Sequence, residues 1–419
     1  MVAEGVCMDG GICYSKHYGN DRQKMKILVV GGGSGGHVTP IVAVVREIWK
    51  LKPRARIEFW TDKKYYTNVV KMTTPMGPSI KARRVLAGKL RRYAHFGPMD
   101  YLRNFDVVLK NVVDGLRLTA GFFQSLVYLR RFKPDAVFLK GGYVALPVGM
   151  AARALRVPYV IHDSDAVPGL TNRVLSRGAR RIATGMPLEN YSYSEEKAEW
   201  TGIPVDREFK PVSAKRQGEL KKDLGFDAAE PLLVVTGGSL GAKNINEAVR
   251  EILPELLKLT AVLLVAGRER YGEMMGLKKY EVWEGGKLTT NFRMIEFTAK
   301  MSELFGAADV VVSRAGASTI AELANMRKAV VMVPNQRLPG RHQVKNAETF
   351  AKAKAAIVVE DGDMVNQPGL LLRAVRELVR DREKRKTMAR NLGEFAKETA
   401  AERLARMVVT EANGDGKRI

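Results

Sequence analysis

Short apolar runs alternate with longer stretches of helical periodicity along most of the chain. In the first half, runs of strand type occupy residues 26–30, 57–60, 136–139, 159–161 and 182–184. In the second half, they occupy residues 232–236, 261–266, 294–297, 310–312, 330–333 and 357–359. Unbroken apolar runs are typical of strands buried on both faces, and the helical stretches between them are typical of crossover connections. The pattern predicts an α/β protein with two Rossmann-like domains, each built on a parallel sheet.

The two series of strands are separated near residues 201–211, where Gly202 and two prolines interrupt both patterns. Domain boundaries usually fall in such segments. We therefore expect an N-terminal domain at residues 25–205 and a C-terminal domain at residues 206–390.

The two ends of the chain carry different patterns. Residues 1–24 lack apolar periodicity, so we expect a flexible extension, or a stretch upstream of a true start at Met25. The pattern at residues 381–412 is helical and rich in charge. It predicts a C-terminal helix within residues 391–419, followed by a tail. This helix either crosses back to the N-terminal domain or packs on its own domain.

Three glycine-rich turns, at residues 31–36, 237–241 and 313–316, each follow a strand-type run and open a helical stretch. Amide groups at a helix N-terminus lack intrahelical partners, and glycine lets a diphosphate approach them closely. The turns predict a sugar-nucleotide site. A dinucleotide site is an alternative for the first turn, because the acidic Asp62 lies near the end of the next strand, although later than that motif requires.

Several side chains beside these turns suit chemistry. His37 stands at the mouth of the first helix, where an imidazole could transfer a proton; the alternative is a structural histidine with satisfied hydrogen bonds. Ser239 offers a hydroxyl in the second turn. Ser318 and Thr319 begin the helix after the third turn, and Glu322 follows one turn later. A carboxylate there can accept hydrogen bonds from two ribose hydroxyls, or it can form a surface ion pair.

Charge and cysteine content limit the function classes. The chain has 69 Lys and Arg against 45 Asp and Glu, a net charge of +24, which predicts an acidic partner such as nucleic acid, anionic lipid or a phosphorylated ligand. No recognised nucleic-acid module accompanies this charge, so we expect no nucleic-acid partner. Cys7 and Cys13 cannot form a disulfide framework or a zinc knuckle. The longest apolar stretch, residues 141–152, is broken by Pro147, so no membrane-spanning helix is expected.

Basic and aromatic residues are concentrated in residues 81–133, which contain twelve Lys and Arg against three Asp. A basic surface with apolar side chains can bind an anionic leaflet. We expect lipid contact from residues 83–105, whereas the apolar residues of 107–129 are expected to belong to the core.

Six motifs appear in order and point to one family. They are Gly31-Gly-Gly-Ser-Gly-Gly-His37, Lys140-Gly-Gly-Tyr143, His162-Asp-Ser-Asp165 through Pro168-Gly-Leu-Thr-Asn172, Gly237-Gly-Ser-Leu-Gly-Ala242, Arg314-Ala-Gly-Ala-Ser-Thr-Ile-Ala-Glu322, and His342-Gln343 through Asn346-Ala347. Over about residues 25–410 the ensemble resembles glycosyltransferase family 28, in particular the UDP-N-acetylglucosamine transferases of bacterial peptidoglycan synthesis. Six ordered motifs are more specific than any single glycine-rich turn.

The resemblance implies a GT-B-type arrangement, with an acceptor domain and a donor domain facing each other across a deep cleft. It implies inverting transfer of N-acetylglucosamine from UDP-GlcNAc to the 4-hydroxyl of the muramyl sugar of lipid I, which forms lipid II, without a metal or other cofactor. It also implies peripheral binding to the anionic inner leaflet, at the cytoplasmic face of the cell membrane, and contact with other cell-wall synthesis proteins.

The resemblance also assigns roles to residues. His37 is the implied base, although the residues alone leave the identity of the base open. Glu322 would hold the ribose, and Gln343 the donor sugar. The full donor set is Ser239, Leu240, Gly241, Phe297, Thr298, Ala317, Ser318, Thr319, Glu322, His342 and Gln343. The acceptor or sugar side is Gly35, Gly36, Asp165 and Asn172.

Two departures from the family pattern affect these assignments. The domain junction reads Gly202-Ile-Pro-Val-Asp206, so a phosphate contact by a guanidinium would have to come from Arg207, one place later. This junction also resembles glycolipid synthases, which keeps a diacylglycerol-type acceptor as the alternative function. The Asp163-Ser-Asp165 triplet has the spacing of a metal-binding D-x-D motif, but its neighbours favour a role in the acceptor loop.

Overall fold

The computed structural model describes residues 24–33, 35–89, 105–284 and 287–414, and within them the first sheet has seven parallel strands. Their spatial order is β3-β2-β1-β4-β5-β6-β7. The strands are β1 (Lys26–Val30), β2 (Arg56–Thr61), β3 (Ile80–Arg84), β4 (Ala136–Leu139), β5 (Tyr159–Asp163), β6 (Arg181–Thr184) and β7 (Ala198–Trp200). All five strands predicted for this half are present. The two edge strands, β3 and β7, were not predicted, because their exposed faces carry polar residues that interrupt the apolar pattern.

The second sheet is also parallel, with the order β12-β9-β8-β13-β14-β15. Its strands are β8 (Leu232–Thr236), β9 (Ala261–Val265), β12 (Phe292–Ile295), β13 (Val310–Ser313), β14 (Ala329–Met332) and β15 (Ile357–Val358). A short antiparallel ribbon, β10 (Trp283–Glu284) with β11 (Lys287–Leu288), lies outside it. The predicted strand at residues 294–297 is two residues too late, so Phe297 follows the strand and is not part of it. The two parallel α/β sheets confirm the predicted fold class.

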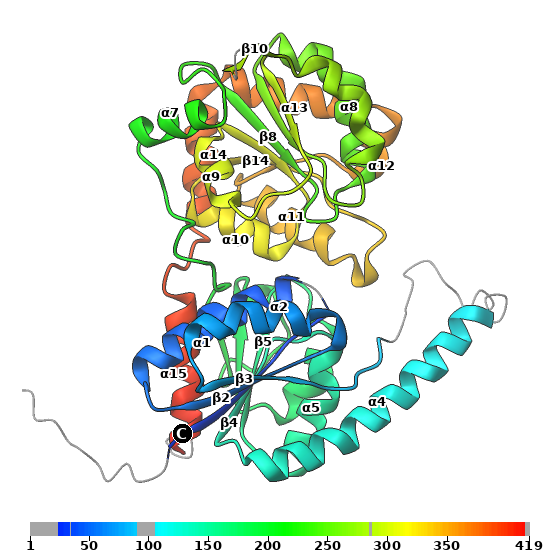
Figure 1. Ribbon diagram of the computed structural model, residues 1–419, viewed down its shortest axis with the longest axis vertical. Coiled ribbons are helices and arrows are strands. Elements are labelled where there is room, and N and C mark those ends of the chain that lie inside the picture. The colour runs from blue at the N-terminus through cyan, green and yellow to red at the C-terminus, as the bar shows by residue number, and fades with distance from the viewer. Residues whose placement is uncertain (1–23, 34, 90–104, 285–286, 415–419) are drawn as a thin grey trace, which may run out of the picture.

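Helices cover both faces of each sheet (Figure 1). In the first domain they are α1 (Thr39–Leu51), α2 (Lys63–Thr73), α4 (Phe105–Phe132), α5 (Gly142–Ala154) and α6 (Leu170–Leu175). In the second they are α7 (Ala214–Asp223), α8 (Lys243–Leu257), α9 (Met301–Ala307), α10 (Ala317–Asn325), α11 (His342–Lys352), α12 (Asp361–Asn366), α13 (Gly369–Arg380) and α14 (Arg382–Gly393). Short 3₁₀ helices are η1 (Gly35–His37), η2 (Thr74–Met76), η3 (Ser176–Gly178), η4 (Leu188–Asn190), η5 (Gly272–Tyr280) and η6 (Pro339–Arg341).

Central strands are buried on both faces, which explains their unbroken apolar sequences. Every residue of β4 and β8 is buried, and the helices pack apolar faces against them. In α1, for example, Ile41, Val44 and Ile48 recur at helical spacing and are fully buried. This packing fixes the carboxyl ends of the strands, from which the glycine-rich turns emerge.

The helical pattern at residues 381–412 is two helices and not one. α14 ends at Gly393, and α15 (Ala400–Asn413) begins after a short connection. Leu392 of α14 is buried in the second domain, whereas Leu404 and Val408 of α15 are buried with α1 in the core of the first domain. α15 therefore lies against the first domain (Figure 1). The domain boundaries stated from the sequence stay predictions.

The long helix α4 corrects one expectation from the sequence. Apolar residues within 107–129 were expected to be core, but Leu109, Val112, Leu116, Phe123 and Val127 are exposed. Leu116 is 67% exposed and Phe123 60%. α4 reaches outward from the first domain (Figure 1), so only part of its length packs on α5. Of the segment expected to contact lipid, residues 90–104 lie outside the described residues.

Candidate functional site

A cavity of about 840 Å³ is lined by loops of both domains. Its first-domain wall contains the turn before α1, the turn between β4 and α5, and the loop after β5. Its second-domain wall contains the start of α10 and the loop leading into α11. The lining residues are Gly32, Gly33, Gly36, His37, Lys89, Gly142, Tyr143, Ser164, Asp165, Val167, Pro168, Gly169, Leu170, Arg173, Gly316, Ala317, Ser318, Thr319, Leu338, Gly340, His342 and Gln343. Segments far apart in the sequence thus form one site.

His37 ends η1, of which the predicted Gly35 is the first residue, and its imidazole faces this cavity. The ring lies against Gly142, where a Cβ atom would come within 3.2 Å of the imidazole Cδ2. Burial, and after it the charge of the nearby Lys140 ammonium, lower the pKa of His37 from 6.5 to about 4. The imidazole is therefore neutral at neutral pH, the state in which a histidine can accept a proton.

Asp62 and Tyr143 hold the first glycine-rich turn in place. The Tyr143 hydroxyl donates to Asp62 Oδ2 at 2.6 Å, and the Gly33 amide donates to Asp62 Oδ1 at 3.3 Å. Asp62 is only 8% exposed. Its carboxylate therefore supports the turn, which removes the sequence argument for a dinucleotide ribose contact. Tyr143 lines the cavity, and our sequence analysis did not assign it a role.

The loop after β5 presents Asp165 to the cavity. Asp165 Oδ1 accepts a hydrogen bond from Asn346 Nδ2 of α11 at 2.9 Å, a contact between the two domains. Asp163 instead lies buried, where it accepts hydrogen bonds from the Tyr193 hydroxyl at 2.6 Å and the Gly169 amide at 3.3 Å. Burial raises the pKa of Asp163 to about 6. The two carboxylates of the D-x-D triplet are thus held separately, by different partners.

The second-domain wall begins at the N-terminus of α10. Gly316 is the N-cap, so the amides of the next residues have no intrahelical partner. Ala317, Ser318 and Thr319 line the cavity together with His342 and Gln343. Gln343 Oε1 accepts a hydrogen bond from the Asn335 amide at 2.9 Å, which orients its side chain. These five predicted donor residues are therefore brought together with His37.

Glu322 lies one turn along α10 from Ser318 and does not line the cavity wall itself. Burial, and after it the nearby Glu208 carboxylate, raise the pKa of Glu322 to about 8. At neutral pH the side chain is therefore mainly a protonated carboxyl group, which can both donate and accept hydrogen bonds.

The remaining predicted donor residues form a separate group at the surface of the second domain. Ser239 and Leu240 lie in the exposed turn that follows β8, and this turn ends at Gly241. The Ser239 carbonyl accepts a hydrogen bond from the Arg268 amide at 3.2 Å. The Arg268 guanidinium lies 3.7 Å from the centre of the Phe297 ring. Arg268 thus joins the second glycine-rich turn to the loop that carries Phe297. In that loop the Lys300 amide donates to the Thr298 hydroxyl at 2.9 Å. Arg268 was not singled out from the sequence.

Asn172 and Arg207 are not part of the cavity wall. Asn172 is 3% exposed, and its Nδ2 donates to the His162 carbonyl at 3.1 Å, so it supports the end of β5, from which the loop with Asp165 emerges. Arg207 Nη2 donates to Glu47 Oε1 at 2.7 Å on the flank of α1. Its neighbour Asp206 accepts a hydrogen bond from Arg46 at 2.8 Å.

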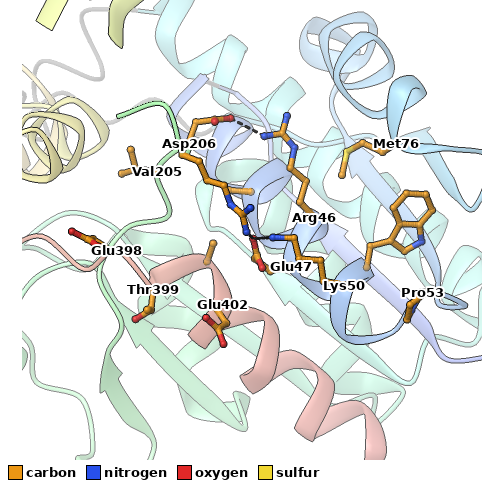
Figure 2. Close-up of a pocket in the computed structure, with 14 residues that line it drawn as sticks. Arg46, Glu47, Lys50, Pro53, Met76, Val205, Asp206, Glu398, Thr399 and Glu402 are labelled. Carbon is orange, nitrogen blue, oxygen red and sulfur yellow. Dashed lines mark hydrogen bonds and ion pairs between the residues drawn. The ribbon is translucent and has the colours of Figure 1, made fainter. Parts of the chain in front are cut away.

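Figure 2 shows this flank, where a second cavity of about 680 Å³ separates α1 from the first turn of α15. Among its lining residues, Arg46 pairs with Asp206, and Glu47 pairs with both Lys50 and Arg207. Arg207 thus contributes to this second cavity and not to the one that holds His37.

The cavity that holds His37, called the main cavity from here on, is also lined by two cations and one hydroxyl that the sequence analysis did not assign to it: Lys89, Arg173 and Ser164. Lys89 belongs to the basic segment, but charge alone does not place a lysine in a cavity. Ser164 lies between Asp163 and Asp165, and this position beside Asp165 was the only sequence signal that could have placed it in the cavity.

Family models match most of the chain. The glycosyltransferase family 28 N-terminal domain matches residues 27–184, and the family 28 C-terminal domain matches residues 232–404. A protein from Listeria welshimeri is 33% identical over 387 residues, which is 92% of this chain and 99% of that relative. One from Lachnospira eligens is 34% identical over 360 residues, 85% of this chain and 92% of the relative. Both relatives are named UDP-N-acetylglucosamine--N-acetylmuramyl-(pentapeptide) pyrophosphoryl-undecaprenol N-acetylglucosamine transferase.

Solved structures share the fold. Acinetobacter baumannii MurG is 23% identical, with a TM-score of 0.68, over 93% of this chain and all of that chain. A UDP-GlcNAc 2-epimerase from Neisseria meningitidis, in complex with UDP-GlcNAc, is 13% identical, with a TM-score of 0.62, over 92% of this chain and all of that chain. At these identities the similarity concerns the two-domain fold alone.

Proposed function

We propose that this chain, which belongs to glycosyltransferase family 28, transfers N-acetylglucosamine from UDP-GlcNAc to the muramyl sugar of lipid I and so forms lipid II. The observation that carries the proposal is the match, at 33% identity over 92% of the chain, to a relative named for this transfer. The cavity supports it, since it joins a proton acceptor on one domain to free helix amides on the other.

The donor diphosphate is proposed to lie at the start of α10. The amides of Ala317, Ser318 and Thr319 and the positive end of the helix dipole would stabilise the charge that grows on UDP as it leaves. Gln343 would bind hydroxyls of the sugar. The group formed by Ser239, Arg268 and Phe297 would hold the remainder of the nucleotide.

The acceptor hydroxyl is proposed to approach from the first domain, where His37 and Asp165 line the cavity. Its oxygen would attack the anomeric carbon from the face opposite UDP, so the configuration inverts. As the new C–O bond forms and the bond to UDP breaks, His37 would take the hydroxyl proton. A neutral imidazole is suited to this step because it has a free lone pair.

Transfer can be tested directly with purified protein, radiolabelled UDP-GlcNAc and a short-chain lipid I analogue. We expect a disaccharide product whose yield is unchanged by a chelator of divalent cations. A parallel assay with diacylglycerol as the acceptor should give no product. Product from diacylglycerol, with none from the lipid I analogue, would contradict the proposal and favour a glycolipid synthase.

Glu322 is proposed to bind the ribose, and its raised pKa makes a specific prediction. At pH 7 its carboxyl group is mainly protonated, so an uncharged amide is a close substitute. Glu322→Gln should bind UDP within about threefold of the wild type, whereas Glu322→Ala should bind about tenfold more weakly, the loss of about 1.4 kcal/mol of hydrogen bonding. Isothermal titration with UDP measures both.

A surface glutamate of the same domain provides the control for this series. Glu303 on α9 forms an exposed pair with Lys300 at 3.1 Å, and Glu303→Ala should leave UDP affinity unchanged. Equal affinities of Glu322→Ala and the wild type would exclude Glu322 from the nucleotide site.

The membrane partner is proposed to meet the outer face of α4. The exposed residues Leu109, Val112, Leu116, Phe123 and Val127 repeat at intervals of three, four and seven, so they form one apolar stripe. The basic residues of the same region would add attraction to anionic headgroups. We propose peripheral binding of this stripe to the cytoplasmic leaflet, while contacts with other cell-wall synthesis proteins stay a prediction. No helix among the described residues is long and apolar enough to cross a bilayer.

Vesicle binding should depend on this stripe. The double substitution Leu116→Glu, Phe123→Glu is expected to reduce cosedimentation with vesicles that contain anionic lipid by about tenfold or more. It removes two exposed apolar groups that would be buried in the bilayer, and it adds two charges that anionic headgroups repel. Met275→Glu, Val365→Glu makes the same chemical change at exposed apolar residues of the second domain and should have little effect. Equal binding of both double variants would refute the assignment to α4.

A further inference from the structure

Lys140 is a buried lysine that directly follows β4 and precedes the two glycines of the Lys140-Gly-Gly-Tyr143 motif. It is 1% exposed. Burial lowers its pKa to about 8, while Asp165 and Asp163 oppose this effect, so the side chain stays mainly an ammonium group at neutral pH. A buried charge is costly unless it is paired or hydrogen-bonded. The hydrogen-bond partners of the Lys140 ammonium therefore indicate its role.

One partner of the ammonium is the fully buried His162 of β5. Lys140 Nζ lies 2.8 Å from His162 Nδ1, and His162 Nε2 lies 2.9 Å from the Gly202 carbonyl. Because a carbonyl only accepts, Nε2 carries the ring proton and Nδ1 accepts from the ammonium. Burial and the Lys140 charge lower the pKa of His162, which agrees with this neutral form.

Two segments connect the domains: the one after β7 and the one between α14 and α15. Gly202 lies in the first of them, where the two segments touch. Its φ of +79° favours glycine, and a Cβ atom there would overlap the Lys397 side chain in the segment between α14 and α15. The Lys397 ammonium in turn lies 3.8 Å from the centre of the Trp200 ring. The hydrogen bond from His162 therefore ends at the crossing of the outgoing and returning chains.

The second partner of Lys140 is Ser164, whose hydroxyl accepts a hydrogen bond from the ammonium. Ser164 lines the main cavity and precedes Asp165, the residue that contacts Asn346 of the second domain. One continuous series of hydrogen bonds thus runs from the cavity through Ser164, Lys140 and His162 to the domain crossing.

We propose that Lys140 is a positioning residue for the transfer reaction: through Ser164 and His162 its ammonium group fixes the acceptor loop relative to the crossing of the two inter-domain connections. The inference rests on the proposed function and extends it to a residue that no catalytic step uses. Without Lys140, the loop that carries Asp165 loses its link to the domain crossing, so the acceptor is held less precisely while the donor loops of the second domain are unaffected. Misplacement of a bound reactant by about 1 Å can cost about 100-fold in rate.

Two substitutions test the position of the ammonium. Lys140→Met should raise KM for the lipid I analogue and lower kcat, for a combined loss of about 100-fold in kcat/KM, while the dissociation constant of UDP stays within about twofold. Ser164→Ala removes only the bond at the cavity end, at a partly exposed residue, and should show a smaller loss of the same kind. Wild-type kcat/KM for the acceptor in both variants would overturn the proposal.

A double-mutant cycle tests whether Lys140 and His162 act as one unit. If they do, His162→Phe combined with Lys140→Met should lose no more activity than the worse single variant. If the losses of the two single variants multiply in the double variant, the two residues act independently, which would contradict their role in one series of hydrogen bonds. Lys328→Met is the matched control, because Lys328 is also buried, also has a pKa lowered to about 8, and donates to the Gly306 and Ala308 carbonyls away from the cavity. It should lower the thermal midpoint and leave the acceptor KM unchanged.

The pH profile separates positioning from general destabilisation. His37 is faced by the charged or titratable groups of Lys140, Asp165, His342 and His162. Removal of the Lys140 ammonium takes away a positive charge, so the acidic limb of kcat/KM should move to higher pH in Lys140→Met and stay in place in Lys328→Met. An unmoved limb in Lys140→Met would contradict this placement. Failure of the proposed function has a different signature, since the wild-type protein itself would then form no product.

Discussion

Replacement of His37 by alanine is expected to lower kcat for transfer by about 100-fold or more, the contribution typical of a general base. The imidazole faces the cavity beside the acceptor loop, and its pKa of about 4 leaves it neutral at neutral pH. UDP affinity should change little, because the proposed donor groups lie on the other domain. Single-turnover kinetics and UDP titration provide the two measurements.

The pH dependence gives a second test of the same residue. His37 accepts a proton only when neutral, so the acidic limb of kcat/KM is expected near pH 4, well below the ordinary histidine value of 6.5. A stability effect accompanies it. Between pH 6.5 and about 4 the unfolded chain binds the His37 proton and the folded chain does not, so the free energy of unfolding should fall as the pH falls through this range. His37→Gln should reduce that slope in denaturant titrations.

The outcome that would remove His37 from the mechanism is near-normal turnover in both His37→Ala and His37→Gln. Asp165 would then be the next candidate to accept the proton, since it is the carboxylate that the loop after β5 presents on the cavity wall. A large kcat loss in Asp165→Asn with His37 intact would identify that alternative.

Replacement of Asn346 by alanine is expected to cause the other large loss, about 100-fold in kcat/KM for both substrates. Asn346 is completely buried between the domains: its Nδ2 donates to Asp165 Oδ1 at 2.9 Å and to the Ala315 carbonyl at 3.0 Å, and its Oδ1 accepts from the Ala166 amide at 2.8 Å. Each buried partner of Asn346 that is left without a hydrogen bond costs about 1–3 kcal/mol. The arrangement of the two domains that these bonds hold therefore becomes less populated.

Thr349, one turn further along α11, offers a matched control. Its hydroxyl also reaches the first domain, at 3.2 Å from Asn190 Oδ1, but it is partly exposed and has a second partner in the Lys345 carbonyl. Thr349→Ala should therefore stay within about twofold of the wild type. Small-angle scattering should show a more open average shape for Asn346→Ala only. Unchanged kinetics and scattering in Asn346→Ala would show that these bonds do not hold the domains together.

Much of the fold could be predicted from local patterns. Unbroken apolar runs located the central strands of both sheets, and glycine-rich turns located the ends from which the cavity walls emerge. The edge strands β3 and β7 were missed because one of their faces is polar, and the helical pattern at 381–412 hid a break at Gly393 that only docking on two different domains reveals. The exposed stripe of α4 was assigned to the core for a related reason, since apolar spacing does not say which neighbour a helix face meets.

The sequence by itself determined the two parallel-sheet domains, the glycine-rich turns that precede helices and the family, because these depend on periodicity and on ordered local motifs. Only the tertiary structure decided that Asn346 bonds to Asp165, 181 residues away, and that Lys140 reaches the Gly202 carbonyl through His162. Hydrogen bonds between side chains so distant along the chain leave no periodic signal. They exist because the packing of sheets and helices brings particular strand ends together, and each buried polar group must then find a partner.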